Sequence, residues 1–133
     1  MRSQPGGHRL RLEAPAPAVA LVDPARVDQI VRNLIANALA YAPNGPVLVR
    51  VVGESDAVRI DVADRGPGIP RDQRERVFEP FYRGPAAERN ETPGSGLGLS
   101  LVKQIAERHG GRVRCEARDG GGSCFVLALP QRA

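Results

Sequence analysis

The chain has 133 residues, which corresponds to a single domain. Basic residues outnumber acidic residues by 19 to 15, and this surplus favours anionic partners without separating nucleic acids from nucleotides. Two cysteines are too few for a disulfide scaffold or a zinc cluster, and the longest apolar stretches are far shorter than the ~20 residues of a transmembrane helix. Integral membrane, collagen-like and disulfide-rich classes are therefore excluded for this stretch of chain.

The first part of the chain predicts a lead-in followed by short strands. Residues 1–8 are polar and glycine-bearing, which indicates a flexible lead-in, and we expect the domain to occupy residues 9–133. Leu10 and Leu12 alternate with arginines, a pattern typical of a half-buried strand. A second short strand is expected at residues 19–22.

A long amphipathic helix is predicted from Asp23 to Tyr41. Asp23 suits the N-cap position, and Pro24 suits the first helical position. Apolar residues then recur at spacings of three and four: Val27, Ile30, Val31, Leu34, Ile35, Ala38 and Leu39. The helix should end near Tyr41, because prolines, an asparagine and a glycine follow.

The remaining elements predict an α+β fold. Two strands at 47–52 and 57–63 are separated by a hairpin-like connection, and a final hairpin is expected from 113–117 and 123–129. A helix over 97–109 should stop at the following glycine pair. Strands joined mostly by hairpins favour a mainly antiparallel sheet with helices on one face.

Between residues 64 and 98 regular structure gives way to six glycines and five prolines. A long irregular segment inside a compact domain is typical of a functional lid. Three of the chain's five Phe and Tyr residues fall within 78–82 of this segment. They either anchor a lid, face a partner, or form a small hydrophobic cluster under a loop.

Asn33 and Asn37 form the first candidate site. They are four residues apart and share one face of the predicted helix, with Tyr41 one turn further along. Amide oxygens are hard ligands that suit Mg²⁺, which otherwise relies on water and substrate phosphates. The alternative is that both asparagines simply face water.

Asp64 to Ile69 form the second candidate site, directly after a predicted strand. A buried aspartate at a strand end can accept a hydrogen bond from an exocyclic amino group such as that of adenine. Gly66 and Gly68 would let the backbone approach a flat ring closely. The alternative is an ordinary turn.

Gly94, Gly96 and Gly98 alternate with other residues and lead into a helix. Free amides at a helix start, together with the helix dipole, form an anion site. The spacing is neither a dinucleotide fingerprint nor a Walker loop. A glycine hinge without a ligand is the alternative.

The order of these motifs is more informative than any one of them. An Asn-x-x-x-Asn helix, D-x-G-x-G-I, F-x-P-F and G-x-G-L-G-L resemble the catalytic ATP-binding domain of bacterial sensor histidine kinases, within the wider group of Bergerat-fold ATPases. The resemblance runs from about Arg9 to Pro130 and includes the segments at 109–111 and 120–125. It implies a two-layer sandwich with a mainly antiparallel, mixed sheet of about five strands, about three helices on one face, and a long flexible ATP lid over 67–98.

The resemblance also implies roles for individual residues. Asn37 would coordinate Mg²⁺ that bridges the ATP phosphates, and Asn33 would support the phosphate side. Asp64 would accept the adenine amino group. The remaining nucleotide contacts would come from Tyr41, Gly66, Gly68, Ile69, Gly94, Gly96, Leu97, Gly98, Leu99 and Ser123, with Ser123 holding a water beside Asp64. Phe78, Phe81 and Arg83 would lie where the lid meets the nucleotide or a partner helix bundle.

One departure from the family pattern concerns the residue before Tyr41. Many relatives carry a lysine or arginine there, whereas this chain has Ala40. Either another arginine compensates, for which Arg83 is the candidate, or nucleotide affinity is weak.

The resemblance places the phosphate acceptor outside this chain, which would hold no catalytic residue of its own. Neither His8 nor His109 has the H-E-x-x-[TN]-P-like context of the acceptor histidine, and the His109 side chain suits a helix C-terminus. The implied partners are ATP, a helical dimerisation domain of the same receptor and a response regulator. The implied whole is a membrane-anchored receptor with this domain, itself monomeric, on the cytoplasmic face. Asn33 also stands where hydrolytic relatives carry a glutamate, which argues against steady ATP hydrolysis.

Two other functions remain open from the sequence: a serine-directed kinase of the same fold, and a basic nucleic-acid-binding domain, which the scattered positive charge disfavours. The two cysteines, Cys115 and Cys124, are expected to be free thiols. They would face each other across the last hairpin if its turn centres on Asp119 and Gly120.

Overall fold

The fold is described here from a computed structural model, which covers residues 10–14, 22–41, 45–80, 98–118 and 120–131. In chain order the elements are β1 (Leu10–Glu13), α1 (Pro24–Tyr41), β2 (Val47–Gly53), β3 (Ala57–Ala63), the 3-10 helices η2 (Arg71–Gln73) and η3 (Arg76–Phe78), α3 (Gly98–Arg108), β4 (Arg112–Ala117) and β5 (Ser123–Pro130). The strand expected at 19–22 falls on residues outside this set, except Val22, which is not in a strand.

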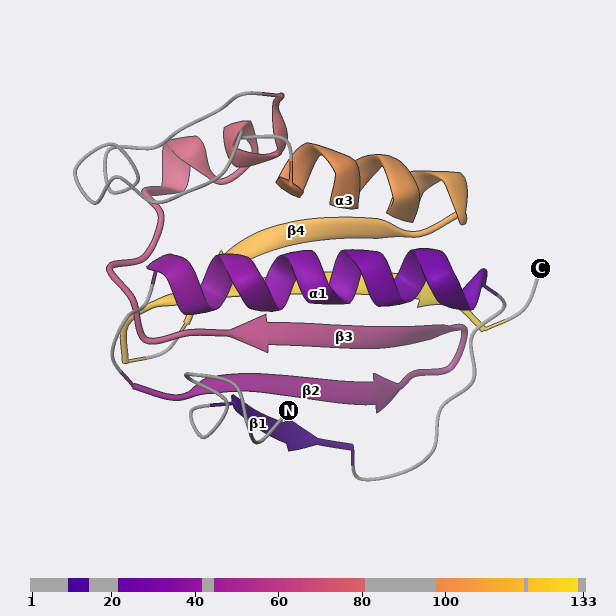
Figure 1. Cartoon of the computed structure of the whole chain (residues 1–133), viewed down its shortest axis with the longest axis horizontal. Helices are drawn as coiled ribbons and strands as arrows, with labels where there is room; N and C mark the ends of the chain where they lie inside the picture. Colours follow the sequence, from indigo (N-terminus) through magenta and orange to yellow (C-terminus); the bar gives the residue numbers. More distant parts are fainter. Residues whose placement is uncertain (1–9, 15–21, 42–44, 81–97, 119, 132–133) are drawn as a thin grey trace.

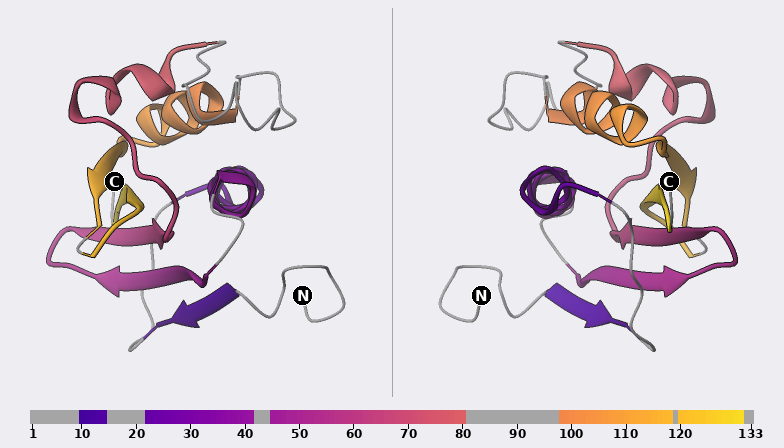
Figure 2. Two further views of the ribbon diagram at one scale, coloured as in Figure 1. Left: turned by 90° about the vertical axis from the view of Figure 1, so that its left-hand side faces the viewer. Right: turned by 90° about the vertical axis from the view of Figure 1, so that its right-hand side faces the viewer.

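The five strands form one sheet in the order β1-β2-β3-β5-β4 (Figure 1). β1 pairs with β2 in parallel, and every other pair is antiparallel. The α-helices that the structure describes, α1 and α3, lie on one face of this sheet, and η3 packs beside α3 (Figure 2). The predicted α+β class, with a mainly antiparallel, mixed sheet and helices on one face, is confirmed.

α1 begins as the sequence predicts. The Asp23 side chain accepts a hydrogen bond from the Ala25 amide at 3.0 Å, and its backbone carbonyl accepts from the amides of Arg26 and Val27. Such an N-cap satisfies amides that have no partner inside the helix. The helix then buries Ile30, Leu34 and Ala38 completely, at a four-residue spacing, against the sheet and α3.

α3 ends at the predicted glycine pair. Gly110 has a φ of +76° and its amide donates to the Glu107 carbonyl at 3.0 Å, while the Gly111 amide donates to Ala106 at 2.8 Å. This pattern of two bonds is the Schellman motif, which satisfies the last carbonyls of a helix. Gly111 is also required sterically, because a Cβ there would lie 2.1 Å from the Ala128 carbonyl oxygen.

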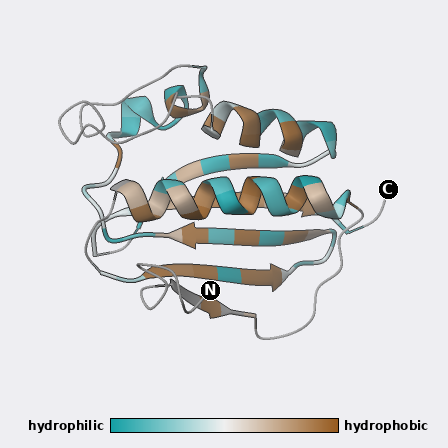
Figure 3. Cartoon of the chain, viewed as in Figure 1, coloured by the Kyte–Doolittle hydropathy of each residue, from teal (hydrophilic) through white to brown (hydrophobic). Residues whose placement is uncertain are grey.

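The core lies between the helices and one face of the sheet. Along β3 buried residues alternate with less buried ones, and hydrophobic and hydrophilic residues alternate along this strand in Figure 3. The opposite face carries ion pairs, in which Arg59 contacts Glu54 and Asp61 at 3.0 Å each, and Arg114 contacts Glu116. One face is thus dry and the other is solvated.

The two cysteines would face each other only if the turn centred on Asp119 and Gly120, and the register of β4 and β5 does not meet this condition. Cys115 lies opposite Phe125, and Cys124 lies opposite Glu116. The β4–β5 loop spans 118–122 and is closed by hydrogen bonds between Arg118 and Gly122 and between Gly121 and Arg118. This register differs by one residue from a turn centred on Asp119 and Gly120, and a one-residue shift places the two side chains on opposite faces. Both thiols are free, as expected.

The buried thiols predict a loss of stability in alkali. Burial raises the pKa of Cys115 from 9.0 to about 12 and that of Cys124 to about 11. The unfolded chain therefore releases these protons at a lower pH than the folded chain. The stability they contribute is fully present below pH 9 and is lost as the pH rises through 11 to 12.

Urea unfolding at several pH values above 8 would measure this effect. The wild type should lose stability more steeply than the double variant Cys115→Ala, Cys124→Ala, which has no thiol proton to release. Parallel declines in the two proteins would contradict the prediction.

Candidate functional site

Several of the predicted site segments meet at one end of the molecule. The C-terminal ends of α1 and β3 lie there, beside the segment that carries η2 and η3 (Figure 1). The described part of the predicted lid is Pro67–Pro80 together with Gly98. Phe81, Arg83, Gly94, Gly96 and Leu97 lie outside the described residues, so their predicted roles stay predictions.

Asp64 is a buried carboxylate at this end of the molecule. It directly follows β3 and is only 4% exposed. Its Oδ1 accepts hydrogen bonds from the Gly66 amide at 2.8 Å and from the Ser123 amide at 3.3 Å, and its own amide donates to the Ser123 carbonyl at 2.9 Å. Backbone groups on two loops thus fix the carboxylate, while Oδ2 accepts no hydrogen bond from the described residues.

Gly122 allows these two loops to come together, a role that the sequence analysis missed. It has a φ of +100°, and a Cβ there would lie 1.9 Å from the Asp64 carbonyl oxygen. A Cβ on Gly68, whose φ is +81°, would lie 3.5 Å from the Gly122 carbonyl oxygen. Backbone therefore packs against backbone beside Asp64. The run of three glycines before Ser123 was the available signal.

Ile69 and Arg74 continue the wall of the site. Ile69 is half-buried and packs against the core, and its carbonyl accepts a hydrogen bond from Arg74 Nε at 3.1 Å. Burial raises the pKa of the Cys115 thiol, and the positive charge of Arg74 lowers it by a smaller amount. The Arg74 guanidinium therefore lies near this thiol. The packing of Ile69 and the hydrogen bond from Arg74 thus hold the first residues of the predicted lid against the core.

Asn33 and Asn37 lie half-buried on α1, each directly before a fully buried core residue. Arg26 precedes them by seven and eleven residues and so shares their strip of the helix. Because Arg26 lines a cavity with α3, the asparagines lie on the side of α1 that is turned toward α3. The prediction of a shared face next to the apolar stripe is confirmed.

The side chains of Asn33 and Asn37 suit Mg²⁺ only when phosphate oxygens complete the coordination of the metal. Within the described residues no group of three or more His, Cys, Asp and Glu side chains could hold a metal ion. Amide oxygens are hard neutral ligands, and Mg²⁺ bound by one or two protein ligands takes its remaining ligands from water and phosphate.

Phe78 belongs to the core rather than to a surface for nucleotide or partner. It is buried and makes an edge-to-face contact with Phe125, with ring centroids 5.9 Å apart. This contact anchors the η3 end of the lid segment to the sheet. Of the three possibilities for residues 78–82, an anchoring role therefore fits Phe78.

The described part of α3 begins at Gly98, and the predicted first residue of this helix, Leu97, lies outside the described residues. Gly98 is exposed, and a Cβ there would meet no atom within 4 Å, whereas Leu99 is half-buried against the core. Among the residues that the structure describes, none would therefore obstruct a side chain at Gly98.

Comparison with known families assigns the fold and the motifs together. Residues 22–133 match the family model described as histidine kinase-, DNA gyrase B-, and HSP90-like ATPase. The chain belongs to this family. The predicted resemblance, first drawn from the order of the motifs, is thereby confirmed.

The chain is similar to proteins named as sensor histidine kinases. The chain is 42% identical over 123 residues to the sensor-like histidine kinase SenX3 of Mycobacterium tuberculosis, covering 91% of this chain and 30% of the relative. It is 43% identical over 120 residues to the histidine-protein kinase AfsQ2 of Streptomyces coelicolor, covering 90% of this chain and 22% of the relative. The chain thus spans less than a third of the length of these relatives.

The chain also resembles solved structures of histidine kinases. The mycobacterial sensor histidine kinase MprB superposes with a TM-score of 0.77 at 32% identity, over 94% of this chain and 84% of that one. Full-length ShkA, solved in complex with AMPPNP, gives a TM-score of 0.80 at 31% identity, over 92% of this chain and 25% of that one. Among the described residues, no helix has the length and hydrophobicity needed to cross a bilayer.

Proposed function

We propose that this domain of the histidine kinase-like ATPase family binds ATP with Mg²⁺ and donates the γ-phosphoryl group to a histidine on a separate helical dimerisation domain. A response regulator then receives the group on an aspartate. The observation that supports this most is the buried Asp64 carboxylate, fixed by two backbone amides, at the end of the fold that carries the asparagine strip of α1.

Asp64 recognises the adenine. Oδ1 is held by the amides of Gly66 and Ser123, which leaves Oδ2 to accept a hydrogen bond from the adenine amino group. Gly68 and Ile69 border the ring, because the glycine keeps the backbone close and Ile69 is anchored in the core. Ser123 is buried beside Asp64 and holds a water there. Tyr41 is assigned to the adenine or the ribose by the family resemblance alone.

The phosphates lie between α1 and the start of α3. Asn37 holds Mg²⁺ that bridges the phosphate oxygens, and Asn33 supports the same side. Gly98 and Leu99 offer amides at the positive end of the α3 dipole, as do Gly94, Gly96 and Leu97 before them. Arg83 supplies the cation that is missing at Ala40.

Phosphoryl transfer depends mostly on positioning and charge neutralisation, so the domain needs no nucleophile of its own. His109 is not suited to the acceptor role, because both of its ring nitrogens are engaged in hydrogen bonds within the fold. The acceptor histidine then belongs to the dimerisation domain of a longer receptor, anchored in the membrane with this domain on its cytoplasmic face.

The proposal is tested with radiolabelled ATP. The domain is mixed with the dimerisation domain of the same receptor, and the labelled product is treated with acid and with alkali. Label that is lost in acid and kept in alkali supports transfer to histidine. Acid-stable label indicates a serine-directed kinase, and salt-sensitive DNA binding without any effect of nucleotide indicates a nucleic-acid-binding domain.

Asn37→Ala is expected to abolish the Mg²⁺ dependence of ATP binding without loss of fold. Asn37 is only half-buried, and alanine is the better helix former, so the helix itself should not suffer. Calorimetric titration with ATP, with and without Mg²⁺, measures the effect. Gln104→Ala removes an exposed amide from α3 and serves as the control. An undiminished Mg²⁺ effect in Asn37→Ala would place the metal elsewhere.

A further inference from the structure

The side chain of His109 joins the two α-helices at the end far from the proposed phosphate site. Its Nδ1 lies 2.8 Å from the Ile105 carbonyl oxygen, in the last turn of α3. Its Nε2 lies 3.2 Å from the backbone nitrogen of Asp23, the N-cap of α1. Asp23 and His109 are 86 residues apart in sequence, so this is a tertiary contact and more than a helix cap. We call this pair of bonds the His109 clasp.

The clasp requires one particular protonation state. A carbonyl oxygen only accepts a hydrogen bond, so Nδ1 must carry a proton and donate to Ile105. A backbone amide only donates, so Nε2 must be unprotonated to accept from Asp23. A doubly protonated ring would place an N–H group against the Asp23 N–H group, and the contact to α1 would be lost.

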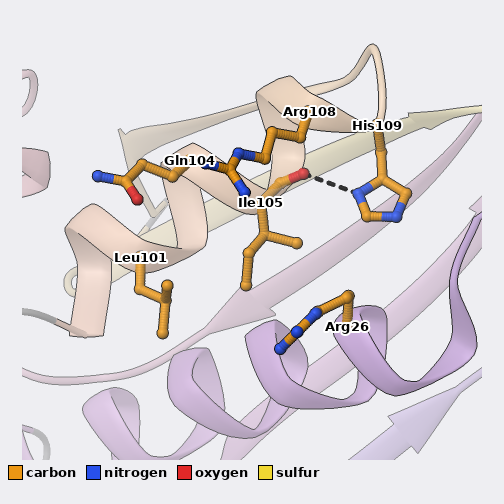
Figure 4. Close-up of a pocket in the computed structure, with 6 residues that line it drawn as sticks. All are labelled: Arg26, Leu101, Gln104, Ile105, Arg108 and His109. Carbon is orange, nitrogen blue, oxygen red and sulfur yellow. Dashed lines mark hydrogen bonds between the residues drawn. The ribbon is translucent and has the colours of Figure 1, made fainter.

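Charged groups of both helices lie around the clasp. Arg26 of α1 and Arg108 of α3 line the same cavity of about 300 Å³ as His109, together with Leu101 and Ile105, whose side chains point from α3 toward α1 (Figure 4). The Asp23 side chain belongs to the same N-cap, and its Oδ1 accepts a hydrogen bond from the Ala25 amide. Solvent reaches this cavity, so the ring can exchange its proton.

The clasp joins the start of α1 to the end of α3, the two helices that carry the two halves of the proposed phosphate site. α1 carries Asn37 and α3 begins at Gly98, both toward the other end of the helix pair. The distance from Asp23 to Asn37 along α1 is about 20 Å at 1.5 Å per residue. A tilt of only a few degrees at the clasp therefore moves Asn37 by about 1 Å relative to α3.

We propose that neutral His109 is a positioning residue for ATP: by holding the ends of α1 and α3 together it keeps Asn37 and the α3 amides at the spacing that ATP–Mg²⁺ requires. Protonation of His109 opens the clasp and lowers ATP affinity. This inference rests on the proposed function of the domain and adds a pH-sensitive control to it.

The test compares ATP affinity at pH 8 and pH 6 in three proteins by calorimetry in the presence of Mg²⁺. The wild type should lose about two- to tenfold more affinity between these pH values than His109→Gln, whose amide keeps a donor and an acceptor but takes up no proton. ATP itself titrates in this range, and the comparison between proteins removes that contribution. His8→Gln changes the other histidine of the sequence and should behave as the wild type.

A second measurement detects the hydrogen bonds of the His109 clasp in the absence of nucleotide. Ring nitrogen chemical shifts of the wild-type chain should show His109 protonated at Nδ1 alone at pH 8, and the Asp23 amide signal should shift when the ring takes up its second proton. A ring protonated at Nε2 alone, or equal pH profiles in wild type and His109→Gln, would overturn the inference. Failure of the wild type to bind ATP at pH 8 would instead overturn the proposed function, and with it the role given to the clasp.

Discussion

Asp64→Asn is expected to weaken ATP binding at least about tenfold and to leave the stability of the fold nearly unchanged. The asparagine carbonyl oxygen can take the place of Oδ1 and accept from the Gly66 and Ser123 amides, so the internal hydrogen bonds survive. Its amide nitrogen then stands in the place of Oδ2. That nitrogen donates, and so does the adenine amino group, so an attractive contact becomes a repulsive one.

Asp61→Asn is the matched control for this experiment. Asp61 lies three residues earlier on β3, on the opposite face of the sheet, where it pairs with Arg59 at 3.0 Å. The same change of charge there should leave ATP affinity unaltered. Calorimetry with ATP and GTP, together with urea unfolding, separates binding from stability. Unaltered ATP affinity in Asp64→Asn would remove the adenine assignment.

The elements that the sequence predicted well are those whose signals are local. α1 was predicted from Asp23, Pro24 and a stripe of apolar residues at helical spacing, and the structure contains both the cap and the stripe. The end of α3 was predicted from Gly110 and Gly111, whose hydrogen bonds stay within six residues. In each case the deciding interactions join residues close together in the chain, so a short window contains the information.

The features that escaped prediction depend on partners far away in the chain. The register of β4 and β5 was off by one residue, because the five-residue loop is closed by backbone bonds that the composition of the loop does not specify. The bond between His109 and Asp23 joins the ends of two helices, and the sequence reveals only its local half, the contact with Ile105. Tertiary packing decides such contacts.

The candidate site contains both a feature that the sequence predicted and features that it did not. Asp64 was predicted as a buried carboxylate at a strand end, from the alternation of β3 and the glycines that follow, and it is buried. The groups that orient it were not predicted, because Ser123 contributes its backbone amide and Gly122 contributes the absence of a side chain. Backbone contributions carry no residue-specific signal, whereas the three adjacent glycines do indicate a place where chains approach closely.

Gly122→Ala is expected to destabilise the domain by about 3 kcal/mol or more, and to weaken ATP binding in the molecules that remain folded. The added Cβ would lie 1.9 Å from the carbonyl oxygen and 2.8 Å from the carbonyl carbon of Asp64, so backbone must move on one side or the other. The loop cannot yield without disturbing the Ser123 amide that holds the Asp64 carboxylate. Stability and binding should therefore decline together.

Gly121→Ala separates this close contact from backbone strain. Gly121 also has a positive φ, +110°, but a Cβ there would meet nothing within 4 Å. Alanine at 121 should cost only the strain of a left-handed conformation, about 1–2 kcal/mol, and should leave ATP affinity intact. Urea unfolding and ATP titration of the two variants give the comparison. Equal losses of stability would mean that conformational strain, and not the approach of Gly122 to Asp64, makes this loop depend on glycine.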